Sequence, residues 1–284
     1  MQSVSVIAPV HNGAEYVEAF FKSYLQADKK NLKVDLLVIE NGSTDATVNI
    51  LKKNKIPFVS CDTTSVYTAR NFGVNLTTGS FLFFVDSDCR IDSAFFISLR
   101  EKLEKYDFIL GYKEISPCKT LMDYFAMVDN KVKWKRSQLP INAGNMLVSR
   151  MAFNKVGGFP PGETTAGDSV IGQKLLNCGF NSLKDSTLIV YDKAKTFKER
   201  IGFEIRESQG FKVKTKYKNE KSASTSPFSN FLSSIRLYFE EIKGLHSRSI
   251  VFRIQLFALS MFWFLMGYVT IILRKMTILK SKPR

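Results

Sequence analysis

Two aspartates, Asp86 and Asp88, come directly after the apolar run 81–85, which predicts a buried β-strand. Residues two positions apart in a strand point to the same side of the sheet, and open α/β sheets bind ligands at the carboxyl ends of their strands. Two carboxylates at one strand end repel each other unless a positive group lies between them. Mg²⁺ or Mn²⁺ carrying phosphate groups meets that need, because hard cations prefer oxygen ligands. The alternative is a polar turn that only closes the strand, since Asp and Ser are common turn residues.

Other polar segments also follow predicted strands, so the place of each strand in the sheet determines where the polar segment after it lies. Strands are predicted at 3–10 and 34–39, and the polar segments 11–13 and 40–45 follow them. Because helical stretches alternate with these strands, we predict an α/β fold with a Rossmann-like, mostly parallel sheet and helices on both faces. The polar segments then meet at the carboxyl edge of that sheet.

Asp168 stands at the start of a helix that is predicted to begin at Gly167. An Asp at that place is typical of a helix N-terminus, where the helix dipole favours a negative charge. Taken alone, the residue indicates a cap rather than chemistry.

These segments together resemble the family 2 glycosyltransferases, enzymes with the GT-A fold. The resemblance runs from Val4 to Phe180 and rests on several motifs that occur in the family's order. The matching segments are the opening strand and turn 4–12, the second-strand motif 39–45, the Ala-Arg-Asn-x-Gly helix start 69–73, the Asp-x-Asp motif 86–88, and the acceptor-side segments 145–146 and 156–159. Asp168 falls where the family's catalytic base lies.

The resemblance implies a role for each matching residue. Glu40, where the family usually has Asp, would accept a hydrogen bond from the nucleotide base, and Arg70 would place a positive charge near the diphosphate. Asp86 would hold the ribose or metal region, and Asp88 would ligate Mg²⁺ or Mn²⁺. Asp168 would take the proton from an acceptor hydroxyl, and one displacement would invert the anomeric configuration. The implied nucleotide-sugar contacts are Pro9, His11, Glu40, Asn41, Asp45, Arg70 and Asp86, and the implied acceptor-side residues are Asn145 and Met146.

Two departures from the family pattern affect these roles. The family often has Glu immediately before its base, whereas this chain has Gly167, and Glu163 lies five residues before Asp168. Glu163 is therefore the reserve candidate for the base. The Gln-x-x-Arg-Trp signature of processive synthases does not follow Asp168, so we expect one sugar to be added per acceptor.

Charge is distributed unevenly along the chain. Its formal net charge is +15. Residues from Lys195 onward include 18 Lys or Arg against 6 Asp or Glu, so +12 of that charge lies in the last 90 residues. This asymmetry indicates an anionic membrane or a nucleic acid as partner, and the neighbouring apolar segment favours lipid phosphates over nucleic acid.

The apolar run 254–273 contains no formal charge over 20 residues, which in a helix spans roughly 30 Å. We expect a membrane segment here, with a buried core helix as the alternative. The positive-inside rule does not fix the orientation of this segment, because basic residues flank both of its ends. A helix that lies in the membrane interface would avoid moving the basic C-terminal tail across the bilayer. Upstream, 228–242 has the pattern of an amphipathic helix at a lipid interface, or of a helix packed on a domain.

The expected domains are a GT-A domain over 1–218, a linker over 219–227, an interfacial amphipathic helix over 228–249 and a transmembrane or membrane-associated segment with a basic tail over 250–284. The N-terminus lacks the features of a signal peptide, and the four cysteines show no paired spacing, so we expect the catalytic domain at the cytosolic face of a membrane.

The predicted function is metal-dependent, inverting transfer of one sugar from a nucleoside diphosphate sugar, with UDP favoured, to a hydroxyl of a lipid-linked or envelope-glycan acceptor. The alternative is a non-catalytic, membrane-tethered scaffold that retains the sugar-nucleotide fold.

Overall fold

The computed structural model describes residues 2–29, 32–97, 99–137, 141–203, 205 and 227–280. The chain divides into two compact units, which we call unit 1 and unit 2. Unit 1 comprises Met1–Glu114 and Leu139–Lys193, and unit 2 comprises Ile115–Gln138 and Ala194–Arg284.

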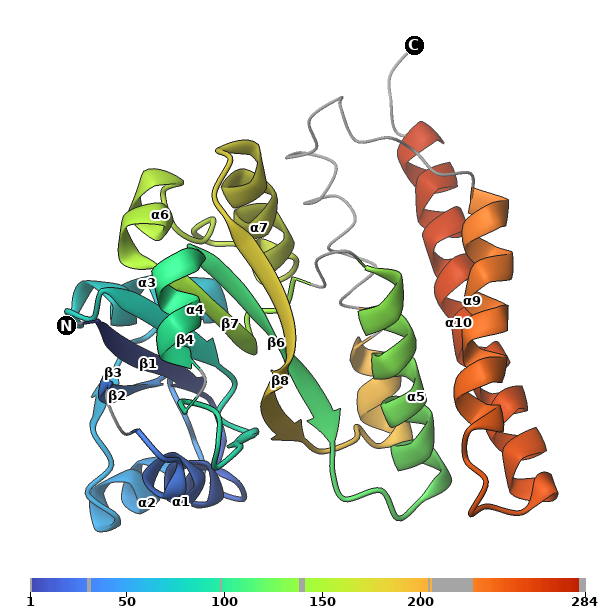
Figure 1. The fold of residues 1–284 in the computed structure, drawn as a ribbon, viewed down its shortest axis with the longest axis horizontal. Coiled ribbons are helices and arrows are strands. Elements are labelled where there is room, and N and C mark those ends of the chain that lie inside the picture. Colours follow the sequence, from blue (N-terminus) through green and yellow to red (C-terminus); the bar gives the residue numbers. More distant parts are fainter. Residues whose placement is uncertain are drawn as a thin grey trace. The chain divides into compact units, whose positions relative to one another are not determined.

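Unit 1 is built on an eight-stranded sheet (Figure 1). In their order across the sheet, the strands are β3 (Phe58–Ser60), β2 (Lys33–Glu40), β1 (Ser3–Val10), β4 (Phe81–Val85), β7 (Asn145–Ser149), β6 (Phe108–Ile115), β8 (Ser182–Asp192) and β5 (Arg90–Ile91). β1 is parallel to β2 and β4, and β2 is parallel to β3, whereas β7 is antiparallel to both β4 and β6, and β5 is antiparallel to β8.

The sheet is therefore mixed: β1 to β4 are parallel to one another, as predicted, and β7 runs against both β4 and β6, so β6 has the same direction as β4. Parallel neighbours need a crossover connection, usually a helix. The regular alternation of strands and helices that led to the prediction ends at Asp88. The long strand β8 lay beyond that alternation and was not predicted.

Helices cover both faces of this sheet, as predicted. One face carries α1 (Val17–Gln26), α2 (Thr47–Lys53) and α4 (Leu99–Lys105), and the other carries α3 (Val66–Asn75), α6 (Arg150–Lys155) and α7 (Gly167–Asn177). Alternate residues of β4 supply the two cores, because successive side chains of a strand point to opposite faces. Phe83 is buried with Phe20 of α1 on one face, and Phe84 is buried with Phe153 of α6 on the other.

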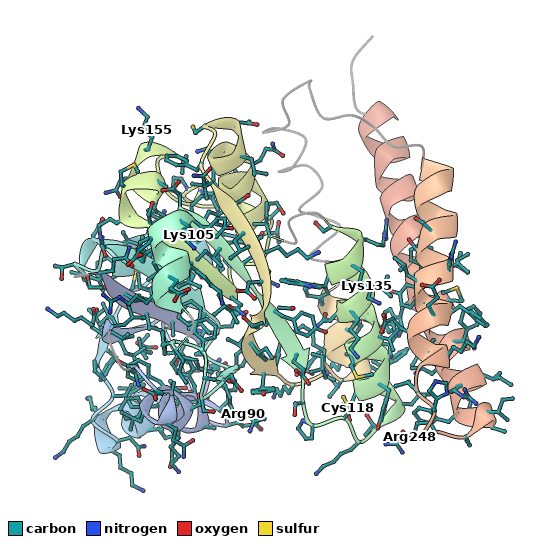
Figure 2. The ribbon with its side chains drawn as sticks, viewed as in Figure 1. Arg90, Lys105, Cys118, Lys135, Lys155 and Arg248 are labelled. Atoms are coloured by element: carbon teal, nitrogen blue, oxygen red, sulfur yellow. The ribbon has the colours of Figure 1, made fainter. Side chains whose placement is uncertain are left out.

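Unit 2 contains α5 (Leu121–Arg136), α9 (Pro227–Lys243) and α10 (Ile250–Lys280). Phe125 of α5, Tyr238 of α9 and Trp263 of α10 share one apolar core. Lys135 of α5, which is labelled in Figure 2, forms an ion pair with Glu241 of α9. The sequence did not predict that α5 groups with the C-terminal helices, because their apolar faces are far apart along the chain.

The C-terminal expectations are met in part. α9 and α10 lie where helices were expected, and residues 219–226 of the expected linker lie outside the described residues. Within the described ranges, no helix combines the length and apolar character needed to cross a bilayer, so the transmembrane segment expected over 254–273 is not supported. Leu256 and Trp263 of that segment are buried in the core of unit 2, as the alternative of a core helix requires.

Candidate active site

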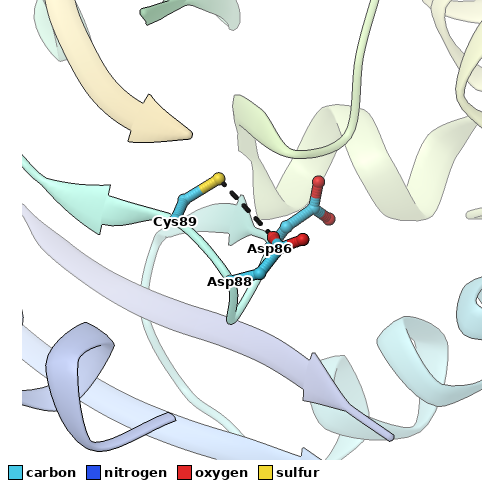
Figure 3. Close-up of side chains that lie close together, drawn as sticks. All are labelled: Asp86, Asp88 and Cys89. Carbon is cyan, nitrogen blue, oxygen red and sulfur yellow. Dashed lines mark hydrogen bonds between the residues drawn. The ribbon is translucent and has the colours of Figure 1, made fainter. Parts of the chain in front are cut away.

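The Asp-Ser-Asp turn is fastened to the end of the neighbouring strand. The hydroxyl of Ser87 is buried and donates a hydrogen bond of 2.8 Å to the carbonyl of Pro9, near the end of β1. This bond fixes the turn at the carboxyl edge of the parallel strands β1 and β4. Potential ligand atoms of Asp86, Asp88 and Cys89 lie within 4.8 Å of one another there (Figure 3).

Two cations of the protein itself balance Asp86. Arg70 Nη2 lies 2.7 Å from Oδ1, and Lys113 Nζ lies 2.9 Å from Oδ2. Lys113 also forms an ion pair of 3.0 Å with Asp192. Burial alone would lower the pKa of Lys113, but the charges of Asp192 and Asp86 outweigh it and raise the pKa well above its ordinary value, so the ammonium stays charged.

This cluster changes the electrostatic argument for a bound metal ion. The sequence interpretation placed an external cation between two repelling carboxylates, whereas Arg70 and Lys113 already neutralise Asp86. Asp88 adds a further carboxylate beside this cluster, and its charge also contributes to the raised pKa of Lys113. Gly144 makes the arrangement possible, because a Cβ atom at that position would lie 2.2 Å from Oδ2 of Asp86.

Asp88 has a buried thiol as its neighbour. Cys89 Sγ donates to Oδ1 of Asp88 over 3.7 Å (Figure 3). Burial raises the pKa of Cys89 well above its ordinary value, which favours the neutral thiol when no metal ion is bound. Burial and then the charge of Asp88 also raise the pKa of Tyr16 to about 12, which keeps a neutral phenol close to the carboxylates.

The residues expected to hold the nucleotide base occur in two linked loops. Glu40 is buried, and its Oε1 accepts a hydrogen bond of 2.6 Å from the backbone N–H of Ser43. A ring nitrogen of His11 lies 2.8 Å from the carbonyl oxygen of Asn41. Asp45 accepts hydrogen bonds from the backbone N–H groups of Ala14 and Thr47, at 3.1 and 2.9 Å. The loops after β1 and β2 therefore support each other at the sheet edge.

Asp168 begins α7 and is half-buried. Its Oδ1 accepts hydrogen bonds from the backbone N–H of Ser169 at 2.8 Å and from the hydroxyl of Tyr67 at 3.4 Å. Glu163, the reserve candidate, is also half-buried, and its backbone carbonyl accepts from the hydroxyl of Ser65. Both candidates thus lie on a segment that contacts α3.

Asn145 and Met146, expected on the acceptor side, are buried in β7. Asn145 Nδ2 donates to the carbonyls of Tyr112 and Leu188, at 3.0 and 2.9 Å, and so joins β7 to β6 and β8. Met146 lies in the apolar core beneath α6 and α7. The structure gives both side chains packing contacts, and their acceptor-side role stays a prediction.

Sequence reasoning missed four residues of the site: Lys113, Asp192, Tyr67 and Gly144. The available signal for Lys113 was a lysine directly after the predicted strand at 108–112. Asp192 ends a strand that was not predicted, and the contacts of Tyr67 and Gly144 depend on pairing between distant segments.

Comparisons with known proteins show what this chain is similar to. The model of the family described as Glycosyl transferase family 2 matches residues 5–154, which is more than half of the chain. The glycosyltransferase GlyA of Streptococcus pneumoniae is 31% identical over 108 residues, covering 36% of this chain and 15% of GlyA. The chain therefore corresponds to a small part of that relative.

Two solved structures share the fold. The mannosyltransferase PcManGT of Pyrobaculum calidifontis, in complex with GDP-Man and Mn²⁺, has a TM-score of 0.59 at 16% identity, with 98% of this chain and 88% of that chain covered. TarS 1–349 of S. aureus, in complex with UDP-GlcNAc, has a TM-score of 0.50 at 20% identity, with coverage of 92% and 72%.

Proposed function

The chain belongs to glycosyl transferase family 2, and from this premise we propose that it transfers a single sugar from a nucleoside diphosphate sugar to a hydroxyl group of a glycan or lipid-linked acceptor. The observation that carries the proposal is the charge-balanced cluster around Asp86, with Asp88 beside it at the ends of β1 and β4. A diphosphate bridged by a cation complements such an edge. The complex of the fold neighbour TarS with UDP-GlcNAc supports a UDP-sugar as donor.

Asp88 is the residue that would hold Mg²⁺ or Mn²⁺, with Asp86 nearby to orient the ribose or the metal's other ligands. The donor set fits a hard cation, because Asp86 and Asp88 offer carboxylate oxygens close to each other. When bound, the ion would neutralise the charge that develops on the departing nucleoside diphosphate. The Mn²⁺ complex of PcManGT supports this assignment.

Asp168 is the proposed base, and it would take the proton from the acceptor hydroxyl as that oxygen attacks the anomeric carbon. A single displacement inverts the configuration at that carbon. Loss of a positioned base costs about 10²- to 10⁴-fold in rate, so Asp168→Asn should lower kcat by that factor. Glu163→Gln should leave kcat within about threefold, and the opposite pattern would move the base to Glu163.

We further propose that unit 2 associates with the cytosolic face of an anionic membrane without crossing it. Support comes from the exposed apolar side chains Ile250, Val251 and Ile254 at the start of α10, with Arg253 among them, and from the excess of basic residues after Lys195. Flotation with vesicles that contain anionic lipid, compared with neutral vesicles, tests this association. Equal flotation with both vesicle types would contradict it.

The decisive experiment for the enzyme is hydrolysis of a panel of nucleoside diphosphate sugars with and without Mn²⁺, using water as the acceptor. Release of UDP that depends on Mn²⁺ is the expected result. Thermal-shift measurements on the same panel report binding, because a bound ligand raises the stability of the folded protein. Binding without any turnover across the panel would favour the non-catalytic scaffold.

A further inference from the structure

Helix α3 is attached along its length to the loop 159–168, which carries both candidate bases. Asn71 Nδ2 donates to the carbonyl of Phe159 at 2.9 Å, and the N–H of Phe159 donates back to Asn71 Oδ1 at 3.1 Å. The N–H of Gly162 donates to the hydroxyl of Thr68 at 3.3 Å. These contacts fix the path of the loop against the helix before the chain reaches Asp168.

Tyr67 of α3 occupies the space beside the base where a side chain at position 167 would lie. A Cβ atom at Gly167 would be 2.6 Å from Cδ2 of the Tyr67 ring, closer than real Cβ atoms approach. The ring also packs on Phe159, with 5.4 Å between centroids. A side chain at position 167 would therefore require the Tyr67 ring to move.

The same helix also holds the donor-side carboxylate. Arg70 follows Tyr67 by three residues, and side chains at that spacing share one face of a helix. The guanidinium of Arg70 lies 5.7 Å from the centre of the Tyr67 ring and binds Asp86. One face of α3 thus touches both the carboxylate at the donor site and the carboxylate proposed as the base.

We propose that Tyr67 is a positioning residue for Asp168. The inference rests on the proposed function, since it assigns a role relative to the proposed base. The Tyr67 hydroxyl and the N–H of Ser169 both donate to Oδ1 of Asp168. Oδ1 is thereby held in place, and Oδ2 is the oxygen that we assign to proton transfer.

Tyr67→Phe tests the role, because it removes one hydroxyl and keeps the ring that packs on Phe159 and Gly167. Mn²⁺-dependent hydrolysis of a UDP-sugar should lose about tenfold in kcat, the effect of one hydrogen bond at the base. KM and the dissociation constant of the donor should stay within about twofold, because the ring still lies beside Arg70. A general loss of structure would change these values together with kcat.

Tyr24→Phe is the matched control. Tyr24 is a buried tyrosine of α1 whose hydroxyl donates to the carbonyl of Val34 at 3.1 Å, and it is part of the core on the other face of the sheet. Its substitution should leave kcat unchanged. An equal fall in kcat for both variants would overturn the specific role of Tyr67.

Gly167→Ala gives a second test through the steric contact. The added methyl group must displace the Tyr67 ring, so kcat should fall at least as far as in Tyr67→Phe, and the two substitutions combined should cost less than the product of their separate effects. Independent, multiplicative effects would contradict a shared action on Asp168.

Kinetic measurements on Tyr67→Phe and Asp168→Asn distinguish an error in the role of Tyr67 from an error in the role of Asp168. If Asp168→Asn is inactive and Tyr67→Phe keeps the wild-type kcat, Tyr67 has no positioning role and the proposed base stands. If Asp168→Asn itself keeps the wild-type kcat, both are overturned.

Discussion

Each unit contains a cluster of charged side chains that is at least partly buried, and the two clusters differ in where they lie. The cluster of unit 1 joins Arg70, Asp86, Lys113 and Asp192, which come from α3, β6 and the ends of β4 and β8. The cluster of unit 2 joins Asp129, Lys133, Arg200 and Tyr238, which lie within its helical part. In unit 1, Asp88 adds a further negative charge beside the cluster. In unit 2, the two cations Lys133 and Arg200 surround the single carboxylate of Asp129.

The comparison separates a cluster that prepares a site from one that stabilises a fold. In unit 2, burial alone would raise the pKa of Asp129, but Lys133 and Arg200 outweigh burial and lower the pKa to about 2. The hydroxyl of Tyr238 also donates to Asp129 at 2.5 Å. In unit 1 the same chemistry fixes Asp86 at the sheet edge, where an additional cation can bind at Asp88. The two clusters contain similar types of side chain, and they differ because only the unit 1 cluster lies at the ends of strands.

Asp88→Asn should produce the largest change and should affect function alone. A metal ion supplies several kcal/mol of stabilisation to the transition state, so Mn²⁺-dependent turnover should fall about 1,000-fold. The fold without metal should be retained, because Asn keeps the shape of the Asp side chain, and the far-UV circular dichroism spectrum checks this. Turnover measured against Mn²⁺ concentration checks the fall in rate, and a wild-type rate would remove Asp88 from the metal site.

Asp129→Ala should show the opposite pattern: it should lower the stability of the protein. It leaves Lys133 and Arg200 without their shared carboxylate, and breaking a buried ion pair from one side costs about 3 kcal/mol. Urea unfolding followed by helical circular dichroism measures the loss. The exposed pair of Lys22 and Glu18 supplies the control, since Glu18→Ala should leave the unfolding midpoint unchanged. Equal midpoints for both variants would deny Asp129 its structural role.

The acid dependence of stability should identify Asp129 as well. Because its folded pKa is about 2 against an ordinary value of 3.8, the unfolded chain takes up the proton first as the pH falls. The stabilisation is therefore complete above about pH 5, is lost as the pH falls toward 2, and amounts to roughly 2 kcal/mol. Unfolding free energies at several pH values should fall less steeply in Asp129→Asn than in the wild type. Identical slopes would contradict the assignment.

The sequence pattern predicted those parts of the structure that depend only on residues close together in the chain. The apolar run 81–85 and the helix start at Gly167 are found at those positions, because strand burial and helix initiation leave their marks within a few residues. The family of the chain followed from ordered motifs. The ion pairs of Lys113 could not be predicted, because Lys113 reaches Asp86 and Asp192 only through the pairing of strands far apart in sequence. For the same reason, the grouping of α5 with α9 and α10 was missed.

Lys113→Met gives the smallest predicted effect and the sharpest test of how the unit 1 cluster works. Methionine keeps the length and apolar volume of the lysine stem, so the change removes the charge that joins Asp86 to Asp192. Arg70 still holds Oδ1 of Asp86, but Oδ2 loses its partner and the carboxylate gains freedom to rotate. Donor affinity should fall about tenfold, the worth of one charge-assisted hydrogen bond, while kcat at saturating donor changes by less.

The control for this substitution is Lys102→Met, which removes a comparable ion pair with Asp185 on β8. Donor affinity in that variant should equal the wild type. If Lys113→Met also binds the donor with wild-type affinity and loses only stability, then the unit 1 cluster is structural like that of unit 2. Asp88 alone would then distinguish the two clusters.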